Sequence, residues 1–269
     1  MTDFTQSLGN RDLFVFFQQL AEAASVPSLA YFRGEMAVEN KEADDFDPVT
    51  VADRDTEATI RALIEADFPD HGIIGEEYGA VRPDSPFQWV IDPIDGTRAY
   101  LSGLPVWGTL VGLLHHGSAI AGMISQPYLN EVFLGAGGVA YFYHGEDMPA
   151  PLVTATTTSL SQAKLMTTSP FLYRGGDVDR FAALEKRVQL SRYGCDCYAF
   201  AMLASGHVDV VVEPGLQTYD IAGLIAPIEA AGGIVTTWDG GRAENGGNVI
   251  AACTPELHAA ACSLLTGGD

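Results

Sequence analysis

The stretch Trp89-Val90-Ile91-Asp92-Pro93-Ile94-Asp95-Gly96-Thr97 decides how the rest of this sequence is interpreted. Trp89–Ile91 predicts a buried strand that runs into a turn bearing two carboxylates, Asp92 and Asp95. Carboxylates three residues apart across a turn can converge on one point. Hard cations such as Mg²⁺ prefer such oxygen ligands, together with backbone carbonyls. Taken alone, Asp92–Thr97 is explained at least as well as an ordinary turn, because Asp, Pro and Gly are common turn formers.

Three further acidic positions lie at the ends of predicted elements. Glu76 and Glu77 follow a short predicted strand, and at most one of them can face a shared site because adjacent strand residues point to opposite faces. Asp53 ends Thr50-Val51-Ala52-Asp53, which matches a helix capping box. Asp220 opens a helix, where the helix dipole favours a carboxylate. Each position has a structural explanation of its own, and only the combination indicates a site.

The composition excludes several classes of partner. The 269 residues include 14 Lys and Arg against 35 Asp and Glu, a net charge of −21, so we expect neither nucleic acid nor a membrane as partner. No apolar run approaches the roughly 18–20 residues of a membrane span, and the N-terminus lacks the features of a secretory signal. The expected compartment is the cytoplasm, and the four cysteines are expected to be free thiols.

The pattern of apolar residues divides the chain into two halves. Residues 1–145 mix helices with a meander of strands, which predicts an α+β half that carries most of the acidic candidates. Residues 146–269 alternate strands with helices, which predicts an α/β half that carries Asp196, Glu213 and Asp220. Helices are expected near 13–24, 60–68, 178–188, 197–205, 220–231 and from 255, and strands near 73–75, 89–91, 109–114, 119–125, 131–134, 139–143, 164–168, 208–212 and 234–237.

Together these segments resemble the inositol monophosphatase superfamily of Mg²⁺-dependent, lithium-sensitive phosphatases. They run in family order and cover nearly the whole chain. The resemblance implies a layered α-β-α-β-α sandwich of the inositol monophosphatase/fructose-1,6-bisphosphatase type, and family members are commonly homodimers. The matching segments are Lys41, Asp47-Pro48-Val49-Thr50-Val51-Ala52-Asp53, Ile74-Gly75-Glu76-Glu77, Trp89 to Thr97, Ser102-Gly103-Leu104-Pro105, Glu213, Tyr219-Asp220-Ile221-Ala222 and Glu229-Ala230-Ala231-Gly232-Gly233.

The resemblance also implies roles for individual residues. Glu76, Thr97 and Asp53 would be catalytic: Glu76 and the Thr97 hydroxyl would orient a metal-activated water, and Asp53 would accept a hydrogen bond from Thr97. Two or three Mg²⁺ ions, with Mn²⁺ as a possible substitute, would be bound by Glu76, Asp92, Asp95, Asp220 and the carbonyl oxygen of Ile94.

Within the superfamily the chain is most similar to the histidinol-phosphatase branch. In the inositol-phosphate branch a small residue usually occupies the place of Asp196, and an acid there suits a cationic substrate. Asp196 and Glu213 would then contact the organic part of the substrate, and Lys41 with the backbone N–H groups of Gly96 and Thr97 would contact the phosphate. The segments that carry this closer likeness are Thr97-Arg98-Ala99-Tyr100, Gly103 to Leu110 and Tyr193-Gly194-Cys195-Asp196-Cys197-Tyr198.

Charge counting favours bound metal ions independently. Four carboxylates would carry −4 and a phosphate monoester about −2, and like charges ~4 Å apart repel by ~4 kcal/mol at an effective dielectric of ~20. Two divalent ions would cancel the carboxylates. The resemblance therefore implies Mg²⁺-dependent hydrolysis of a small phosphate ester, with L-histidinol phosphate as the expected substrate, and the charge count agrees with the metal requirement. Inositol 1-phosphate or another small monophosphate is the alternative, and a non-catalytic metal-binding homologue is a third possibility.

Overall fold

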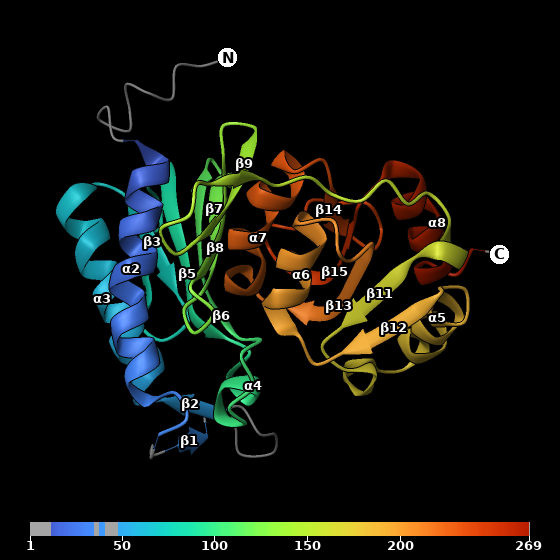
Figure 1. Cartoon of the computed structure of the whole chain (residues 1–269), viewed down its shortest axis with the longest axis horizontal. Helices are drawn as coiled ribbons and strands as arrows, with labels where there is room; N and C mark the ends of the chain where they lie inside the picture. Colours follow the sequence, from blue (N-terminus) through green and yellow to red (C-terminus); the bar gives the residue numbers. More distant parts are fainter. Residues whose placement is uncertain (1–11, 35–37, 41–47, 269) are drawn as a thin grey trace.

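The computed structural model describes residues 12–34, 38–40 and 48–268. Two large β-sheets alternate with three layers of helices (Figure 1). In order, the layers are α2 with α3, an eight-stranded sheet, α6 with α7, a five-stranded sheet, and α5 with α8. The α-β-α-β-α sandwich that the sequence led us to expect is confirmed.

The first helical layer consists of α2 (Leu13–Tyr31) and α3 (Val51–Asp67). α2 places Phe16 and Phe17 against Trp89 of the adjoining sheet, with ring centroids 5.4 and 5.5 Å apart. Because these apolar residues recur at helical spacing, their burial is what the sequence predicted. In this layer α3 begins at Val51, which places Asp53 in its first turn.

The length and composition of α2 would allow it to cross a membrane, since it has 19 residues and a mean hydropathy of 1.2. The expectation that no apolar stretch approaches this length was wrong for α2. In the structure one face of the helix lies on the sheet and buries residues such as Leu20, Ala21 and Ala24. Packing in the sandwich therefore accounts for the apolar residues on this face of the helix.

The eight-stranded sheet has the strand order β10-β9-β8-β7-β6-β5-β3-β4. Neighbouring strands from β5 to β10 pair antiparallel, as the predicted meander requires, and β3 pairs with β5 in parallel. The short edge strands β4 and β10 were not predicted. The strands are β3 (Gly72–Gly75), β4 (Gly79–Val81), β5 (Phe87–Asp95), β6 (Gly108–His115), β7 (Ser118–Gln126), β8 (Glu131–Ala136), β9 (Val139–His144) and β10 (Ala150–Pro151).

Strand β5 differs from its prediction, because it continues to Asp95 rather than turning after Ile91. Its pairing with β6 shifts register between Asp92 and Asp95. Pro93 lies inside this irregularity, where a residue without an N–H group costs no ladder hydrogen bond. The Thr109 hydroxyl donates to the Pro93 carbonyl oxygen at 2.8 Å, which satisfies the displaced backbone. The two carboxylates are thus carried on an irregular strand end and not on a turn.

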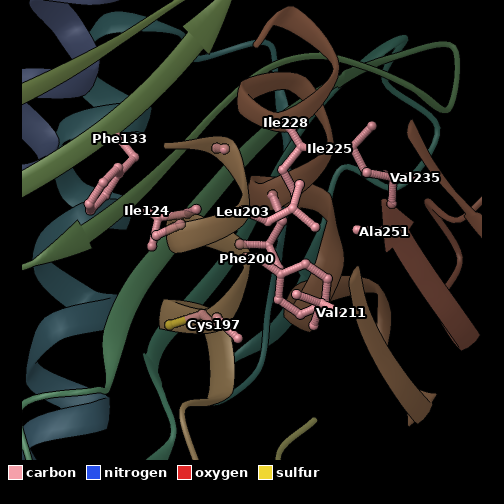
Figure 2. Close-up of a cluster of buried hydrophobic side chains, with 14 of the residues drawn as sticks. Ile124, Phe133, Cys197, Phe200, Leu203, Val211, Ile225, Ile228, Val235 and Ala251 are labelled. Atoms are coloured by element: carbon pink, nitrogen blue, oxygen red, sulfur yellow. The ribbon is translucent and has the colours of Figure 1, made fainter. Parts of the chain in front are cut away.

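The middle layer joins the two sheets through α6 (Asp196–Ala204) and α7 (Thr218–Ala230). Both helices are apolar around most of their circumference because a sheet covers each side. Figure 2 shows the resulting core, in which side chains of α6 and α7 meet those of both sheets. The helices contribute Phe200, Leu203, Ile225 and Ile228, the first sheet contributes Ile124 and Phe133, and the second sheet contributes Val211, Val235 and Ala251.

The five-stranded sheet has the order β12-β11-β13-β15-β14. Its strands β11 and β14 were predicted, β13 begins two residues later than predicted, and β12 and β15 were missed. The outer helices α5 and α8 cover its far face, and Thr254 is the N-cap of α8. The remaining elements are β1 (Val38–Asn40), β2 (Pro48–Thr50), α4 (Thr97–Leu101), η1 (Leu160–Gln162), β11 (Lys164–Thr167), η2 (Pro170–Leu172), α5 (Gly176–Glu185), β12 (Leu190–Tyr193), β13 (Val210–Leu216), β14 (Ile234–Thr237), β15 (Gly247–Ala252) and α8 (Pro255–Leu265).

Glycines in the first sheet let α7 approach it at backbone contact. A Cβ atom at Gly122 of β7 would lie 2.4 Å from the carbonyl oxygen of Gly223, and one at Gly112 of β6 would lie 2.6 Å from the carbonyl carbon of Ala222. Since real Cβ atoms do not approach backbone this closely, larger residues would push the helix away. The close approach fixes the first turn of α7, which carries Asp220.

We expect Gly122→Ala to destabilise the protein by about 1–3 kcal/mol, because the new methyl group would overpack a rigid helix–sheet contact. Urea unfolding would measure this loss. Gly176→Ala is the matched control, since its Cβ would meet no atom within 4 Å. An unchanged unfolding midpoint for Gly122→Ala would show that the helix–sheet contact is looser than the structure has it.

Candidate active site

Asp53 lies in the first turn of α3, in the capping box predicted from the sequence. Its Oδ2 accepts hydrogen bonds from the Thr50 N–H (2.8 Å) and the Thr50 hydroxyl (2.5 Å). The side chain is buried, and this burial raises the pKa of Asp53 to about 6; the hydrogen bonds from Thr50 oppose the rise and nearby Glu76 adds to it. The cap therefore holds a carboxylate beside a second acidic group.

Asp92 is the most isolated carboxylate of the site. It is buried at the end of β5, and its Oδ1 has no hydrogen-bond partner among the residues that the structure describes. Burial raises the pKa of Asp92 well above its usual range, and the charges of Glu76, Asp95 and Asp220 raise it further. A buried carboxylate oxygen without a donor is costly unless a cation satisfies it.

Asp95 connects the first sheet to the middle helical layer. Its Oδ2 accepts a hydrogen bond of 2.6 Å from the backbone N–H of Cys197, in the first turn of α6. Burial raises the pKa of Asp95 well above its usual range, followed by the charges of Asp196 and Asp220, while the Cys197 contact lowers it. One oxygen is thus anchored by a helix N-terminus.

Asp220 completes a cluster of three carboxylates from two different elements. Its Oδ2 accepts from the Gln217 N–H at 2.6 Å in a second capping box, at the start of α7. Asp92, Asp95 and Asp220 each offer an oxygen such that the three lie within 4.8 Å of one another. Carboxylate oxygens at this spacing fit a hard divalent cation, and Asp92 also has an oxygen without a donor among the described residues.

Glu76 lies at the edge of this cluster, immediately after β3. Its backbone N–H donates to the Ile91 carbonyl oxygen at 3.2 Å, which continues the pairing of β3 with β5. Its charge raises the pKa values of both Asp53 and Asp92. Glu76 therefore contributes to the electrostatic field of the site.

Thr97 begins the short helix α4, directly after Gly96. Gly96 has a φ of 86°, a left-handed conformation that glycine adopts without strain. The Thr97 hydroxyl donates to the carbonyl oxygen of Ile94 at 3.2 Å. A hydroxyl has one proton to donate, so the expected bond from Thr97 to Asp53 is replaced by this local one.

Two more acids line the far rim of the site. Asp196 has a φ of 43°, unusual outside glycine, and its side chain lies so close to Gly96 that a Cβ there would be 3.1 Å away. Burial raises the pKa of Asp196, and hydrogen bonding to Thr168 and the charge of Arg98 lower it. Asp196 is therefore packed against Gly96, the residue that follows β5.

Glu213 lies in β13 of the second sheet and is buried. Its Oε1 accepts from the Thr168 N–H at 2.5 Å, and its Oε2 lies 3.4 Å from the Thr167 hydroxyl. Burial raises the pKa of Glu213 to about 8, with contributions from Asp196 and Asp95, against the Thr168 hydrogen bonds. Asp95, Asp196 and Glu213 thus form a continuous acidic rim, although they come from different layers.

The structure brings together nearly all the residues that the sequence singled out. Lys41 is the exception, because it lies outside the described residues. Sequence reasoning missed Glu57, which is fully buried one helical turn after Asp53 and contacts the turn that carries Glu76. The four-residue spacing of Asp53, Glu57 and Arg61 on one helix would have indicated a shared face.

A sequence profile of the inositol monophosphatase family matches residues 10–267. The protein is a phosphate monoester hydrolase of a metal-dependent class, whose ion is typically Mg²⁺, and the acidic cluster fits such an ion. The chain belongs to the inositol monophosphatase family.

Individual relatives share the fold and class but differ in the substrates that their names state. The bifunctional phosphatase IMPL2, chloroplastic, of Arabidopsis thaliana is 39% identical over 257 residues, 91% of this chain and 72% of that protein. A histidinol-phosphatase of Mycobacterium tuberculosis is 34% identical over 209 residues, 77% of this chain and 80% of that protein. The structure of an inositol monophosphatase from Zymomonas mobilis covers 99% of this chain and 100% of its own, with a TM-score of 0.84 and 33% identity.

We expect Asp92→Asn to raise the melting temperature of the metal-free protein by about 2–4 °C or more, the shift that ~1 kcal/mol produces in a large domain. The pKa of Asp92 is higher in the folded than in the unfolded chain, so its ionised form opposes folding at high pH. This penalty declines as the pH falls through the folded pKa and vanishes below the ordinary value of 3.8. The difference in melting temperature between variant and wild type should therefore narrow in acid.

Scanning fluorimetry across pH, with and without Mg²⁺, would measure both effects. Wild-type protein should gain stability from Mg²⁺, whereas Asp92→Asn should gain much less. Asp84→Asn, on an exposed residue, is the matched control. A metal-free Asp92→Asn protein less stable than wild type at every pH would contradict the proposed repulsion.

Proposed function

We propose that this protein is a histidinol-phosphatase, which hydrolyses L-histidinol phosphate to L-histidinol and phosphate in histidine biosynthesis. The observation that carries the proposal is the acidic rim of Asp95, Asp196 and Glu213 beside the metal-binding cluster. L-Histidinol phosphate bears an ammonium group close to its phosphate. An ammonium at this rim would donate hydrogen bonds to carboxylates whose pKa values are raised by burial and mutual repulsion.

The names of relatives support the same substrate. The relative from Mycobacterium tuberculosis is named a histidinol-phosphatase, and relatives with that name occur in two further bacteria at 33–34% identity. We transfer the activity to this chain because Asp196 and Glu213 supply the chemistry that a cationic leaving group needs.

The residues of the site can be assigned roles on this proposal. Asp92, Asp95 and Asp220, with Glu76 and the Ile94 carbonyl oxygen, would hold two or three Mg²⁺ ions. Bound Mg²⁺ supplies positive charge for the phosphate and lowers the pKa of an attacking water.

The other groups of the site would orient the reactants. Glu76 and the Thr97 hydroxyl would aim the water at phosphorus, with Asp53 held close by Thr50. The backbone N–H groups of Gly96 and Thr97 would donate to phosphate oxygens, and Lys41 would balance part of the phosphate charge. Asp196 and Glu213 would accept from the ammonium of the leaving group.

Hydrolysis of inositol 1-phosphate is the alternative, favoured by the likeness to the Zymomonas mobilis structure. Inositol is a neutral polyol, so it would make no ion pair with the acidic rim. The two substrates therefore differ in how strongly they should depend on Asp196.

Phosphate release from a panel of esters tests the proposal directly. With Mg²⁺, we expect kcat/KM for L-histidinol phosphate to exceed that for inositol 1-phosphate by at least about tenfold, and EDTA or Asp92→Asn to abolish release from both. A preference for inositol 1-phosphate would favour the alternative. Phosphate release that EDTA leaves unchanged would exclude metal-dependent hydrolysis altogether.

Asp196→Ala tests the ammonium contact. A lost charge-assisted hydrogen bond corresponds to about 1.5–3 kcal/mol, so KM for L-histidinol phosphate should rise roughly tenfold or more while KM for inositol 1-phosphate changes little. Asp196→Asn keeps the shape without the charge and should behave in the same way. Equal effects on the two substrates would refute the contact.

We further propose that the protein acts in the cytoplasm as a homodimer whose protomers each combine the α+β half 1–145 with the α/β half 146–269. The homodimer is the usual assembly implied by the family resemblance. Light scattering on the purified protein would measure its mass in solution.

A further inference from the structure

Glu57 is an acid beside the site whose two carboxylate oxygens both accept hydrogen bonds. It is 0% exposed and lies on α3, one turn after Asp53. Its Oε2 accepts from the backbone N–H of Glu77 at 2.6 Å, and its Oε1 accepts from the N–H of Tyr78 at 3.2 Å. The carboxylate therefore binds the chain directly after Glu76.

Arg61 neutralises this buried carboxylate and extends the contact. Its Nε donates to Oε1 of Glu57 at 2.6 Å, and its Nη2 donates to the Gly79 carbonyl oxygen. Because the charge of Glu57 is paired here, it adds little net charge to the site. Glu57 and Arg61 together contact both ends of the turn between β3 and β4.

Gly75 shows how closely this turn is held. A Cβ atom at Gly75 would lie 1.9 Å from Oε1 of Glu57 and 2.6 Å from Nη2 of Arg61. Only glycine leaves room for the carboxylate to reach the backbone at this point. The residue before Glu76 is thus packed against the same carboxylate that binds the two residues after it.

This arrangement opposes a specific force. Glu76 faces Asp53 and Asp92, whose pKa values its charge raises, so the turn that carries it is repelled from the site. The N–H of Glu76 is bonded to Ile91, and the next two N–H groups are bonded to Glu57. Three successive backbone donors hold the turn against the repulsion.

We propose that Glu57, paired with Arg61, is a positioning residue that sets the affinity of the site for Mg²⁺ by fixing Glu76. The proposal rests on the proposed function, in which Glu76 is a metal ligand. Glu57 does not touch the ion or the substrate. It acts through the backbone of residues 77 and 78.

Mg²⁺ binding to the purified, metal-free chain tests this role by isothermal titration calorimetry. Glu57→Gln keeps the shape but replaces one acceptor oxygen by an NH2 group, which donates and cannot accept, so one backbone N–H of the turn loses its partner. We expect the Mg²⁺ dissociation constant to rise about 10–100-fold, the usual effect of changing a group that orients a metal ligand. The Mg²⁺ concentration that half-activates phosphate release should rise in parallel.

Glu65→Gln is the matched control on the same helix, since Glu65 is half exposed and lies 3.5 Å from Arg82. Its Mg²⁺ affinity should equal that of wild type. Arg61→Lys keeps the charge but not the guanidinium fork, and should weaken Mg²⁺ binding in the same direction by a smaller factor. This second variant decides the question if Glu57→Gln does not fold.

The outcomes distinguish this proposal from the proposed function. A folded Glu57→Gln protein with a lower melting temperature but wild-type Mg²⁺ affinity would overturn the positioning role and leave the proposed function standing. Wild-type Mg²⁺ affinity in Arg61→Lys would do the same if Glu57→Gln is unfolded. A wild-type protein that binds no Mg²⁺ would overturn both.

Discussion

Mutual repulsion among buried carboxylates is the constraint on which the rest of this structure depends. Asp92 keeps an oxygen without a donor, and Asp95 and Asp220 place further oxygens within 4.8 Å of each other. Isolated groups of this kind would turn to water or take up protons. Here the packed strand β5 on one side and helix α7 on the other prevent them from separating. Protons or cations at this site would therefore relieve a repulsion that the packing of the fold imposes.

The fold offsets this repulsion with backbone donors at helix N-termini. Asp53 accepts from Thr50 at the start of α3, Asp220 accepts from Gln217 at the start of α7, and Asp95 accepts from the first turn of α6. Each helix end adds a partial positive charge, which favours a carboxylate there. The described bonds of Asp53 and Asp95 use one oxygen of each carboxylate, which leaves acceptor capacity for an ion. The sandwich architecture matters because it places the first turns of three helices beside these carboxylates.

The acids of the site divide into two kinds according to their partners. Glu57 is saturated by two backbone donors and Arg61, so it is a neutralised structural group. Asp92 is buried, but one of its oxygens accepts no hydrogen bond from the described residues. Glu213 is intermediate: it accepts a hydrogen bond from Thr168, and its pKa is nevertheless raised to about 8. Groups of the first kind fix the geometry, whereas groups of the second kind are available for ions and substrate. Acidic residues thus serve two purposes in this protein, and the number of hydrogen-bond donors around a carboxylate distinguishes one purpose from the other.

The sequence by itself determined the class of fold and the acidic motifs. Helical spacing predicted α2, alternation predicted the meander, and the capping box at Asp53 and the carboxylate of Asp220 in a first helical turn are local patterns that the structure confirms. Local patterns could not show that β5 continues past Ile91, because its register shift depends on the pairing with β6. Nor could they show that Asp95 meets the N–H of Cys197, 102 residues later. Contacts between residues far apart in the sequence follow from how the layers pack. Only the tertiary structure therefore decided which acids share one site and which are neutralised by other partners.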